Sequence, residues 1–416
     1  MDKTAMKTTQ LGQTGLEITR VGFGAWAIGG GGWEFGWGPQ DDEESIAAIH
    51  YALGQGVNWI DTAAAYGFGR SERIVGRALE GLVGRPYVFT KASLLEGPDR
   101  KVLHSLKRDS ILREAAGSIE RLGVDAIDLY QIHWPIPAED IQEGWAALAE
   151  LKEQGIVRHI GVSNFDAEQL RAIGQIAPIE TLQPQYSLIE REAEQEILPF
   201  AEREGIGVIV YSPMGSGMLA GGMTRERIAG MAEDDWRKRD QRFTEPQLSR
   251  NLALVERLKE VADRYDTTPG AVAVAWTLLN PAVDGAIVGF RRPDQVDPIL
   301  PAAGLELTDG TLPKSKGVRD EHGWIHRSRG DGQPDRRPPA RRRPRRVRNE
   351  PHQKQGRATD RPSGRCWQSW ARRSRTWGPM AKGCCSSSRS TSASQCRRSP
   401  SARDCCSPNA AASTLS

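Results

Sequence analysis

Cysteine is absent from the first three quarters of the chain. Residues 1–311 therefore have no disulfide framework and no thiolate metal site. Apolar runs of the ~18 residues that a membrane span needs are also missing, and residues 1–12 lack the apolar stretch of a signal peptide. These absences predict a cytoplasmic body with no metal and no membrane partner. All six cysteines come late, at Cys366, Cys384, Cys385, Cys396, Cys405 and Cys406.

The near-neutral total charge hides a division of the chain. Residues 312–416 carry 25 Lys and Arg against 7 Asp and Glu, whereas residues 1–311 carry 31 against 46. Past residue 310 the apolar periodicity stops and Arg, Ser, Pro and Gly dominate, which predicts a disordered basic tail. Two origins stay open: a frame-shifted translation without selected function, or a basic arm that binds nucleic acid. The tail has no repeating basic–aromatic design, which favours the first origin and disfavours nucleic acid as a partner.

Strand and helix patterns alternate through residues 1–311, which predicts a parallel sheet covered by helices. Eight such units favour a closed (β/α)8 TIM barrel over a doubly wound open sheet. A β-hairpin over 8–11 and 16–18 is expected before the barrel. The helical patterns cover 45–53, 110–122, 142–151, 193–203 and 252–265. The strand patterns cover 18–24, 57–60, 87–90, 126–132, 158–162, 180–183, 207–211 and 285–289.

Four chemically active side chains follow consecutive predicted strands. Asp61 and Tyr66 come after the second strand, Lys91 after the third and His133 after the fourth. Each alone has a structural explanation: a helix N-cap for Asp61, rim packing for Tyr66, a solvated cap for Lys91 and an interior imidazole for His133. Barrel enzymes, however, place their active sites at this end of the strands. The coincidence of all four predicts an active site.

Proton donation to a developing alkoxide is the chemistry that suits this set. Tyr66 would be the general acid in reduction and the base in oxidation. A positive Lys91, held in place by Asp61, is expected to lower the pKa of the phenol from its usual value near 10. His133 would bind and orient the same carbonyl oxygen.

At these positions the sequence resembles the aldo-keto reductase superfamily, over about residues 8–309. The resemblance implies a reductase of small aldehydes or ketones that uses NADP(H), and it implies a set of cofactor-binding residues. Ser163, Asn164 and Gln183 would hold the nicotinamide carboxamide, and Tyr211 would stack on its ring. Residues 212–219 would wrap the pyrophosphate, and residues 289–295 would hold the 2′-phosphate. The cofactor set predicted in this way is Gly24, Trp26, Ser163, Asn164, Gln183, Tyr211, Ser212, Pro213, Met214, Gly215, Gly289, Arg291 and Gln295.

Two arginines support the phosphate assignment on physical grounds. Arg291 and Arg292 stand where a strand ends and a helix begins, and arginine binds phosphate in a bidentate way. A surface arginine pair before a helix is the structural alternative. Pro298 and Ile299 replace an Asn that often contacts adenine in the family, so the choice between NADP and NAD stays open. Residues 56–69 and 189–192 look most like the bacterial general-stress reductases, which are related to potassium-channel β-subunits.

The glycine-rich stretches do not carry a nucleotide motif. Gly22 and Gly24 open like a dinucleotide fingerprint, but Ala27 stands where a third glycine is required. We interpret Gly24 and Trp26 as part of the site floor and residues 29–42 as a flexible loop. Trp33 and Trp37 in that loop either wall a substrate pocket or pack on the barrel rim.

The sequence thus predicts an NADP(H)-dependent carbonyl reductase on residues 1–311. The main alternative is a barrel that binds NADP(H) as a sensor or regulatory subunit with little turnover. The physiological substrate and the oligomeric state do not follow from the sequence.

Overall fold

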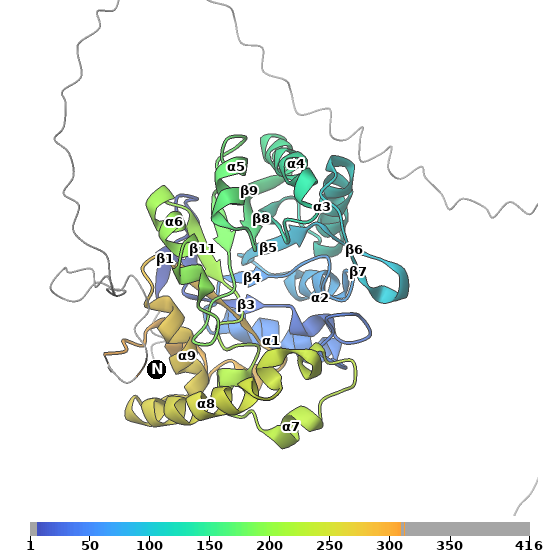
Figure 1. Cartoon of the computed structure of the whole chain (residues 1–416). Coiled ribbons are helices and arrows are strands. Elements are labelled where there is room, and N and C mark those ends of the chain that lie inside the picture. The colour runs from blue at the N-terminus through green and yellow to red at the C-terminus, as the bar shows by residue number, and fades with distance from the viewer. Residues whose placement is uncertain (1–5, 309–311, 313–416) are drawn as a thin grey trace, which may run out of the picture. The chain divides into compact units, whose positions relative to one another are not determined.

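The structure is a computed structural model that describes residues 6–308 and 312. Eight parallel strands close into a barrel in the spatial order β10, β11, β12, β3, β4, β5, β8 and β9 (Figure 1). The predicted TIM barrel and its N-terminal hairpin are therefore confirmed. The strands are β3 (Val21–Gly24), β4 (Trp59–Asp61), β5 (Tyr87–Ala92), β8 (Ile127–Ile132), β9 (Val157–Ser163), β10 (Thr181–Gln183), β11 (Gly207–Val210) and β12 (Gly285–Gly289).

A small apolar core fills the lower half of the barrel interior. Trp59 and Phe89 lie at its centre, with ring centroids 5.3 Å apart. The hairpin of β1 (Thr8–Gln10) and β2 (Glu17–Thr19) closes this end, and buried Ile18 packs into the same core. Gly22 has to be glycine here, because a Cβ would lie 2.1 Å from the Trp59 ring.

Alternation along the strands places polar side chains above this core. Successive side chains of a strand point to opposite faces. Asp61 and Lys91 follow Trp59 and Phe89 by two residues, so they point into the barrel one layer higher, at the C-terminal ends of β4 and β5. The upper layer of the barrel interior is therefore a polar site on an apolar floor.

Helices form the outer layer around the strands (Figure 1). Some of them begin at a side-chain cap. The Asp41 carboxylate accepts the Glu44 amide at the start of α1, and Asp166 forms a capping box at the start of α5. The helices are α1 (Asp42–Gly54), α2 (Arg70–Leu79), α3 (Arg108–Leu122), α4 (Ile141–Glu153), α5 (Ala167–Ile173), α6 (Ile197–Glu204), α7 (Arg225–Ala229), α8 (Gln247–Arg264) and α9 (Pro269–Leu278). In the described part of the chain, no helix has the length and apolar character to cross a bilayer.

The elements differ from the sequence prediction in several places. The first predicted strand, 18–24, is divided at Arg20 into a hairpin strand and a barrel strand. The prediction also missed α2, α5, α7, α9 and the hairpin of β6 (Leu94–Glu96) and β7 (Val102–His104), and its helix over 193–203 is divided into η4 (Glu192–Glu194) and α6. Helix α9 is buried from Gly270 to Thr277, so it has no polar face and no amphipathic period to detect.

Leu312 is buried and packs against the main core of the barrel. The rest of the predicted basic tail lies outside the described residues, as do its predicted disorder and its two proposed origins.

Candidate active site

A buried hydrogen-bonded group joins Asp61, Tyr66 and Lys91 at the top of the barrel. The Lys91 Nζ lies 2.6 Å from the Asp61 Oδ2, 2.9 Å from the Thr62 carbonyl oxygen and 3.2 Å from the Tyr66 Oη. Lys91 is 1% exposed and Tyr66 is 8% exposed. All three donors of the ammonium group are used, so the lysine is fixed beside the phenol.

Burial controls the ionisation of this group. Burial raises the pKa of the Tyr66 phenol well above 10, and the Asp61 carboxylate adds to the rise. The expected lowering of this pKa does not hold for this structure, because burial, together with the nearby Asp61 carboxylate, outweighs the effect of the Lys91 ammonium. Burial also lowers the pKa of Lys91 and raises that of Asp61, and each shift is opposed by the partner. Tyr66 thus keeps its proton at neutral pH.

His133 faces the same point from the end of β8. Its ring lies edge-on to the Tyr66 ring, with centroids 5.7 Å apart. Burial lowers the pKa of His133 well below 6.5, and the positive charge of Lys91 adds to this shift. The imidazole is therefore neutral, and its Nδ1 has no hydrogen-bond partner within the described residues.

A chain of polar side chains continues from Asp61 across the barrel mouth. The Gln183 Nε2 donates to the Asp61 Oδ1 at 2.8 Å, and the Ser163 Oγ donates to the Gln183 carbonyl oxygen at 2.7 Å. The Asn164 Nδ2 then donates to Ser163, and the Tyr211 Oη donates to the Asn164 Oδ1 at 2.8 Å. The structure thus joins the predicted carboxamide-binding residues and the predicted aromatic to the acid–base group.

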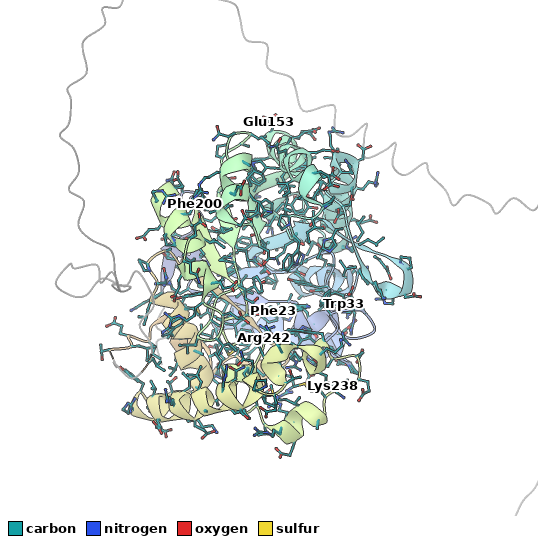
Figure 2. All side chains as sticks on the ribbon, in the orientation of Figure 1. Phe23, Trp33, Glu153, Phe200, Lys238 and Arg242 are labelled. Atoms are coloured by element: carbon teal, nitrogen blue, oxygen red, sulfur yellow. The ribbon has the colours of Figure 1, made fainter. Side chains whose placement is uncertain are left out.

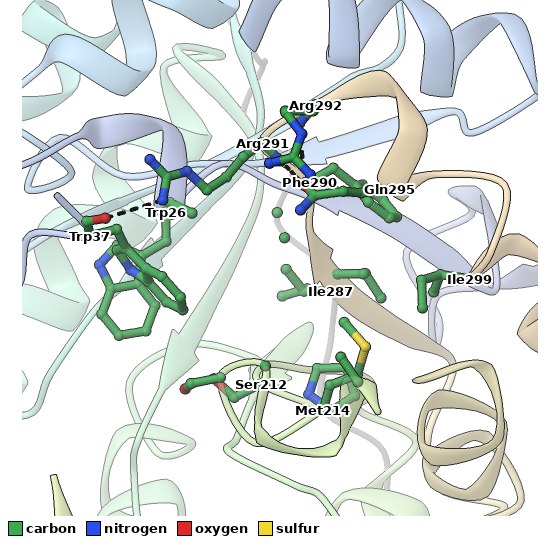
Figure 3. Close-up of a pocket in the computed structure, with 18 of the residues that line it drawn as sticks. Trp26, Trp37, Ser212, Met214, Ile287, Phe290, Arg291, Arg292, Gln295 and Ile299 are labelled. Atoms are coloured by element: carbon green, nitrogen blue, oxygen red, sulfur yellow. Dashed lines mark hydrogen bonds between the residues drawn. The ribbon is translucent and has the colours of Figure 1, made fainter. Parts of the chain in front are cut away.

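A cavity of about 440 Å³ runs from Asp61 and Tyr66 toward the adenosine end of the predicted cofactor site. Most of the predicted cofactor residues line it, as Figure 3 shows for Trp26, Ser212, Met214 and Arg291. Gly215 lines neither this cavity nor the second one, and its left-handed backbone shapes the turn that follows Ser212. The predicted residues on its wall are Gly24, Trp26, Tyr211, Ser212, Pro213, Met214, Gly289, Arg291 and Gln295.

The walls of this cavity suit a phosphorylated dinucleotide. Ser212, Gly215, Ser216 and Gly217 all have positive φ, so this segment curls into a concave turn of the kind that binds anions with backbone amides. Four arginines line this cavity, and its lining residues include two acids, Asp61 and Asp294. The arginines are Arg227, Arg237, Arg291 and Arg292.

A second cavity, of about 460 Å³, opens on the other side of Tyr66. Tyr66, Trp26, Tyr211, Ser212 and Ser216 line both cavities, so the two meet at the acid–base group. The walls of the second cavity are mainly aromatic or apolar, including Trp33, Phe35, Trp134, Ile136 and Trp236. Of the two loop tryptophans, Trp33 lines this cavity and Trp37 lines the first.

The sequence prediction missed the segment that covers this second cavity. An Asp-x-Arg pattern occurs twice here, at the start of the short helices η6 (Trp236–Arg239) and η7 (Gln241–Phe243). Asp235 bonds the backbone amide and the guanidinium of Arg237, and Asp240 does the same for Arg242. Arg237 then lies over Trp37, with its guanidinium carbon 4.4 Å from the ring centroid. Arg242, labelled in Figure 2, lies over Trp236 at 5.5 Å and lines the cavity. The repeat at a five-residue interval was the available signal.

The comparisons decide the family. The sequence model of the Aldo/keto reductase family matches residues 20–319. The chain belongs to this family. It is 39% identical to aldo-keto reductase YhdN of Bacillus subtilis over 305 residues, which are 73% of this chain and 90% of that protein. It is 36% identical to an NADH-specific methylglyoxal reductase of Escherichia coli over 320 residues, covering 73% and 95%.

A solved structure gives the same assignment. The glycerol dehydrogenase AKR11B4 of Gluconobacter oxydans superposes with a TM-score of 0.66 at 38% identity, over 74% of this chain and 92% of that one. This aldo/keto reductase is therefore an oxidoreductase of the NAD(P)H-dependent, carbonyl-reducing type.

Proposed function

We propose that this chain reduces aldehydes or ketones to alcohols with NADP(H), reversibly and by direct hydride transfer. The observation that carries the proposal is the buried contact of 3.2 Å between the Lys91 Nζ and the Tyr66 Oη. Tyr66 lines both cavities. A carbonyl in the second cavity would meet the phenol exactly where the first cavity ends.

We propose four roles for the acid–base residues. Tyr66 gives its phenolic proton to the carbonyl oxygen as that oxygen gains negative charge. Lys91 stabilises the phenolate that remains, and Asp61 keeps the lysine charged and in place. His133, which is neutral, donates one N–H to the same oxygen and orients the substrate. The bound nicotinamide would supply the hydride.

We propose that the first cavity holds the cofactor. Ser163, Asn164 and Gln183, which line the second cavity, would bind the carboxamide where the two cavities meet, and Tyr211, which lines both, would support the ring. The concave turn after Ser212 would bind the pyrophosphate. A surplus of arginine at the far end supports NADPH over NADH, since a 2′-phosphate adds negative charge there. The NADH-specific relative makes this preference the first point to measure.

We also propose the branch and the domain division that the sequence suggested. The chain would belong with the bacterial general-stress reductases, and the similarity to YhdN supports a bacterial reductase of this kind. The barrel would end near residue 311, and residues 312–416 would be an appended segment. Limited proteolysis of the full chain should leave a stable fragment that ends soon after Leu312. A protease-resistant fragment that included the tail would contradict the division.

The decisive experiment compares the wild type with Tyr66→Phe in NADPH oxidation assays with aldehydes, ketones and quinones. The variant should lose turnover by at least about a hundredfold, the usual contribution of a general acid, while it still binds NADPH. Tyr130→Phe is the matched control, because it removes another buried phenol that lines neither cavity. A folded wild type that binds NADPH but turns over no substrate would favour the sensor function instead.

A further inference from the structure

One loop without helix or strand contributes side chains to the walls of both cavities. Arginines from elsewhere in the chain hold this loop in place through hydrogen bonds to its backbone. The loop covers residues 30–41, between η1 (Ala27–Gly29) and α1. Its Trp37 lines the cofactor cavity, and its Trp33 and Phe35 line the carbonyl cavity. Four arginines donate to five of its backbone carbonyls: Arg100 to Gly32, Arg239 to Glu34, Arg291 to Trp37 and Pro39, and Arg70 to Gln40.

Arg291 makes the most extensive of these contacts. Its Nη1 donates to the Trp37 carbonyl oxygen at 3.2 Å, its Nη2 donates to the Pro39 carbonyl oxygen, and its Nε donates to the Gln40 Oε1 at 2.5 Å. The Gln40 Nε2 returns a bond of 3.0 Å to the Arg291 carbonyl oxygen. Three of the five guanidinium N–H groups therefore point at one loop, as the side chain reaching toward Trp37 in Figure 3 shows.

The neighbouring arginine behaves differently. The Arg292 side chain is 49% exposed, and its guanidinium bonds only Asp294, on the same turn, at 3.0 Å. Among the described residues its side chain makes no hydrogen bond to the loop, yet it lines the same cavity as Arg291. Arg292 is therefore free to meet a phosphate without any change in the loop, whereas a phosphate that took all the donors of Arg291 would release the loop.

We propose that Arg291 is a positioning residue that holds the loop 30–41 over the cofactor and carbonyl cavities, for NADH as well as for NADPH. This inference rests on the proposed function, because it assumes that the first cavity binds a nicotinamide cofactor. It assigns Arg291 a role that does not depend on the 2′-phosphate. The expected signature is a loss of affinity for a cofactor that has no 2′-phosphate at all.

The experiment measures the dissociation constants of NADH and NADPH by quenching of tryptophan fluorescence, with full-length wild type, Arg291→Met, Arg291→Lys and Arg292→Met. Both Arg291 variants should bind NADH about tenfold more weakly, the effect of one lost charge-assisted hydrogen bond. Lysine keeps the charge but not the planar fork, so it should not rescue NADH binding. Arg292→Met is the matched control and should weaken NADPH alone.

Two further readouts separate loop positioning from a general structural defect. At saturating cofactor, Arg291→Met should raise the KM of the carbonyl substrate, because the same loop walls the second cavity. Gln40→Met should also weaken NADH binding, and it should add little to Arg291→Met because the two residues act through one contact.

The outcomes are distinguishable. Unchanged NADH affinity in Arg291→Met, with loss of NADPH affinity alone, would overturn the inference and make Arg291 a phosphate ligand. Additive effects of Gln40→Met and Arg291→Met on NADH affinity would also overturn it. If the folded wild type bound neither cofactor, the proposed function itself would be refuted.

Discussion

Glu114 offers a quantitative test of the electrostatics behind the active site. It lies on α3 and is 8% exposed, and its carboxyl accepts the Ser93 amide at 3.0 Å and the Ser110 hydroxyl at 3.2 Å. Burial is the main cause that raises its pKa from 4.5 to about 7. The Glu72 carboxylate raises it further, although Arg121, which pairs with Glu72, lowers it.

The sign of the pH dependence follows from the raised pKa. Between pH 4.5 and pH 7 the folded chain keeps a proton on Glu114 that the unfolded chain has lost, so folding stability falls as pH rises through this window. A shift from 4.5 to about 7 corresponds to about 3.4 kcal/mol when complete. About 2.5 kcal/mol of this loss should occur between pH 5 and pH 8.

Glu114→Gln should remove that loss, because the glutamine Oε1 can still accept the Ser93 amide without ionising. The measurement is urea unfolding at pH 5 and pH 8, and the quantity compared is the difference between variant and wild type, which cancels most other titrating groups. The variant should gain about 2.5 kcal/mol relative to the wild type between the two pH values. Glu120→Gln, at an exposed position of the same helix, should show no such gain. Equal pH dependence in Glu114→Gln and the wild type would refute the reasoning.

Three other predictions concern the site and its support. The rate of carbonyl reduction at saturating substrates, measured by stopped flow, should not change between pH 7 and pH 9. The raised pKa of Tyr66 and the lowered pKa of His133 both fall outside this range. A change of this rate with pH near pH 7 would contradict the prediction. Asp61→Asn should lower the free energy of unfolding by about 3–5 kcal/mol, since it leaves a buried Lys91 without its carboxylate, and calorimetry should show this loss. Gly161→Ala should lower the melting temperature, because the new Cβ would lie 2.0 Å from the Thr181 Oγ1 and overpacking costs about 1–3 kcal/mol; an unchanged melting temperature would show that Thr181 can move aside.

The barrel could be predicted because its signals are local and repeated. Each strand is a short apolar run before a turn. The polar Asp61 and Lys91, which come two residues after Trp59 and Phe89, indicate the catalytic ends of their strands. A helix whose faces do not differ in polarity gives no such signal, as α9 shows, because it is buried on all sides from Gly270 to Thr277. The structure brings the predicted acid–base residues together because each stands at or soon after the end of a barrel strand.

The ionisation of the site could not be predicted in the same way, because it depends on distances. A lysine near a tyrosine lowers the pKa of the phenol only where burial and a neighbouring carboxylate do not outweigh it, and only the folded structure shows that Tyr66 is buried beside Asp61. The same limit applies to Arg291. Its place before a turn predicts a phosphate ligand, whereas its bonds to Trp37, Pro39 and Gln40 join segments about 250 residues apart in the sequence. Sequence position identifies the groups that can bind an anion, but their function follows from the partners that the folded chain has already given them.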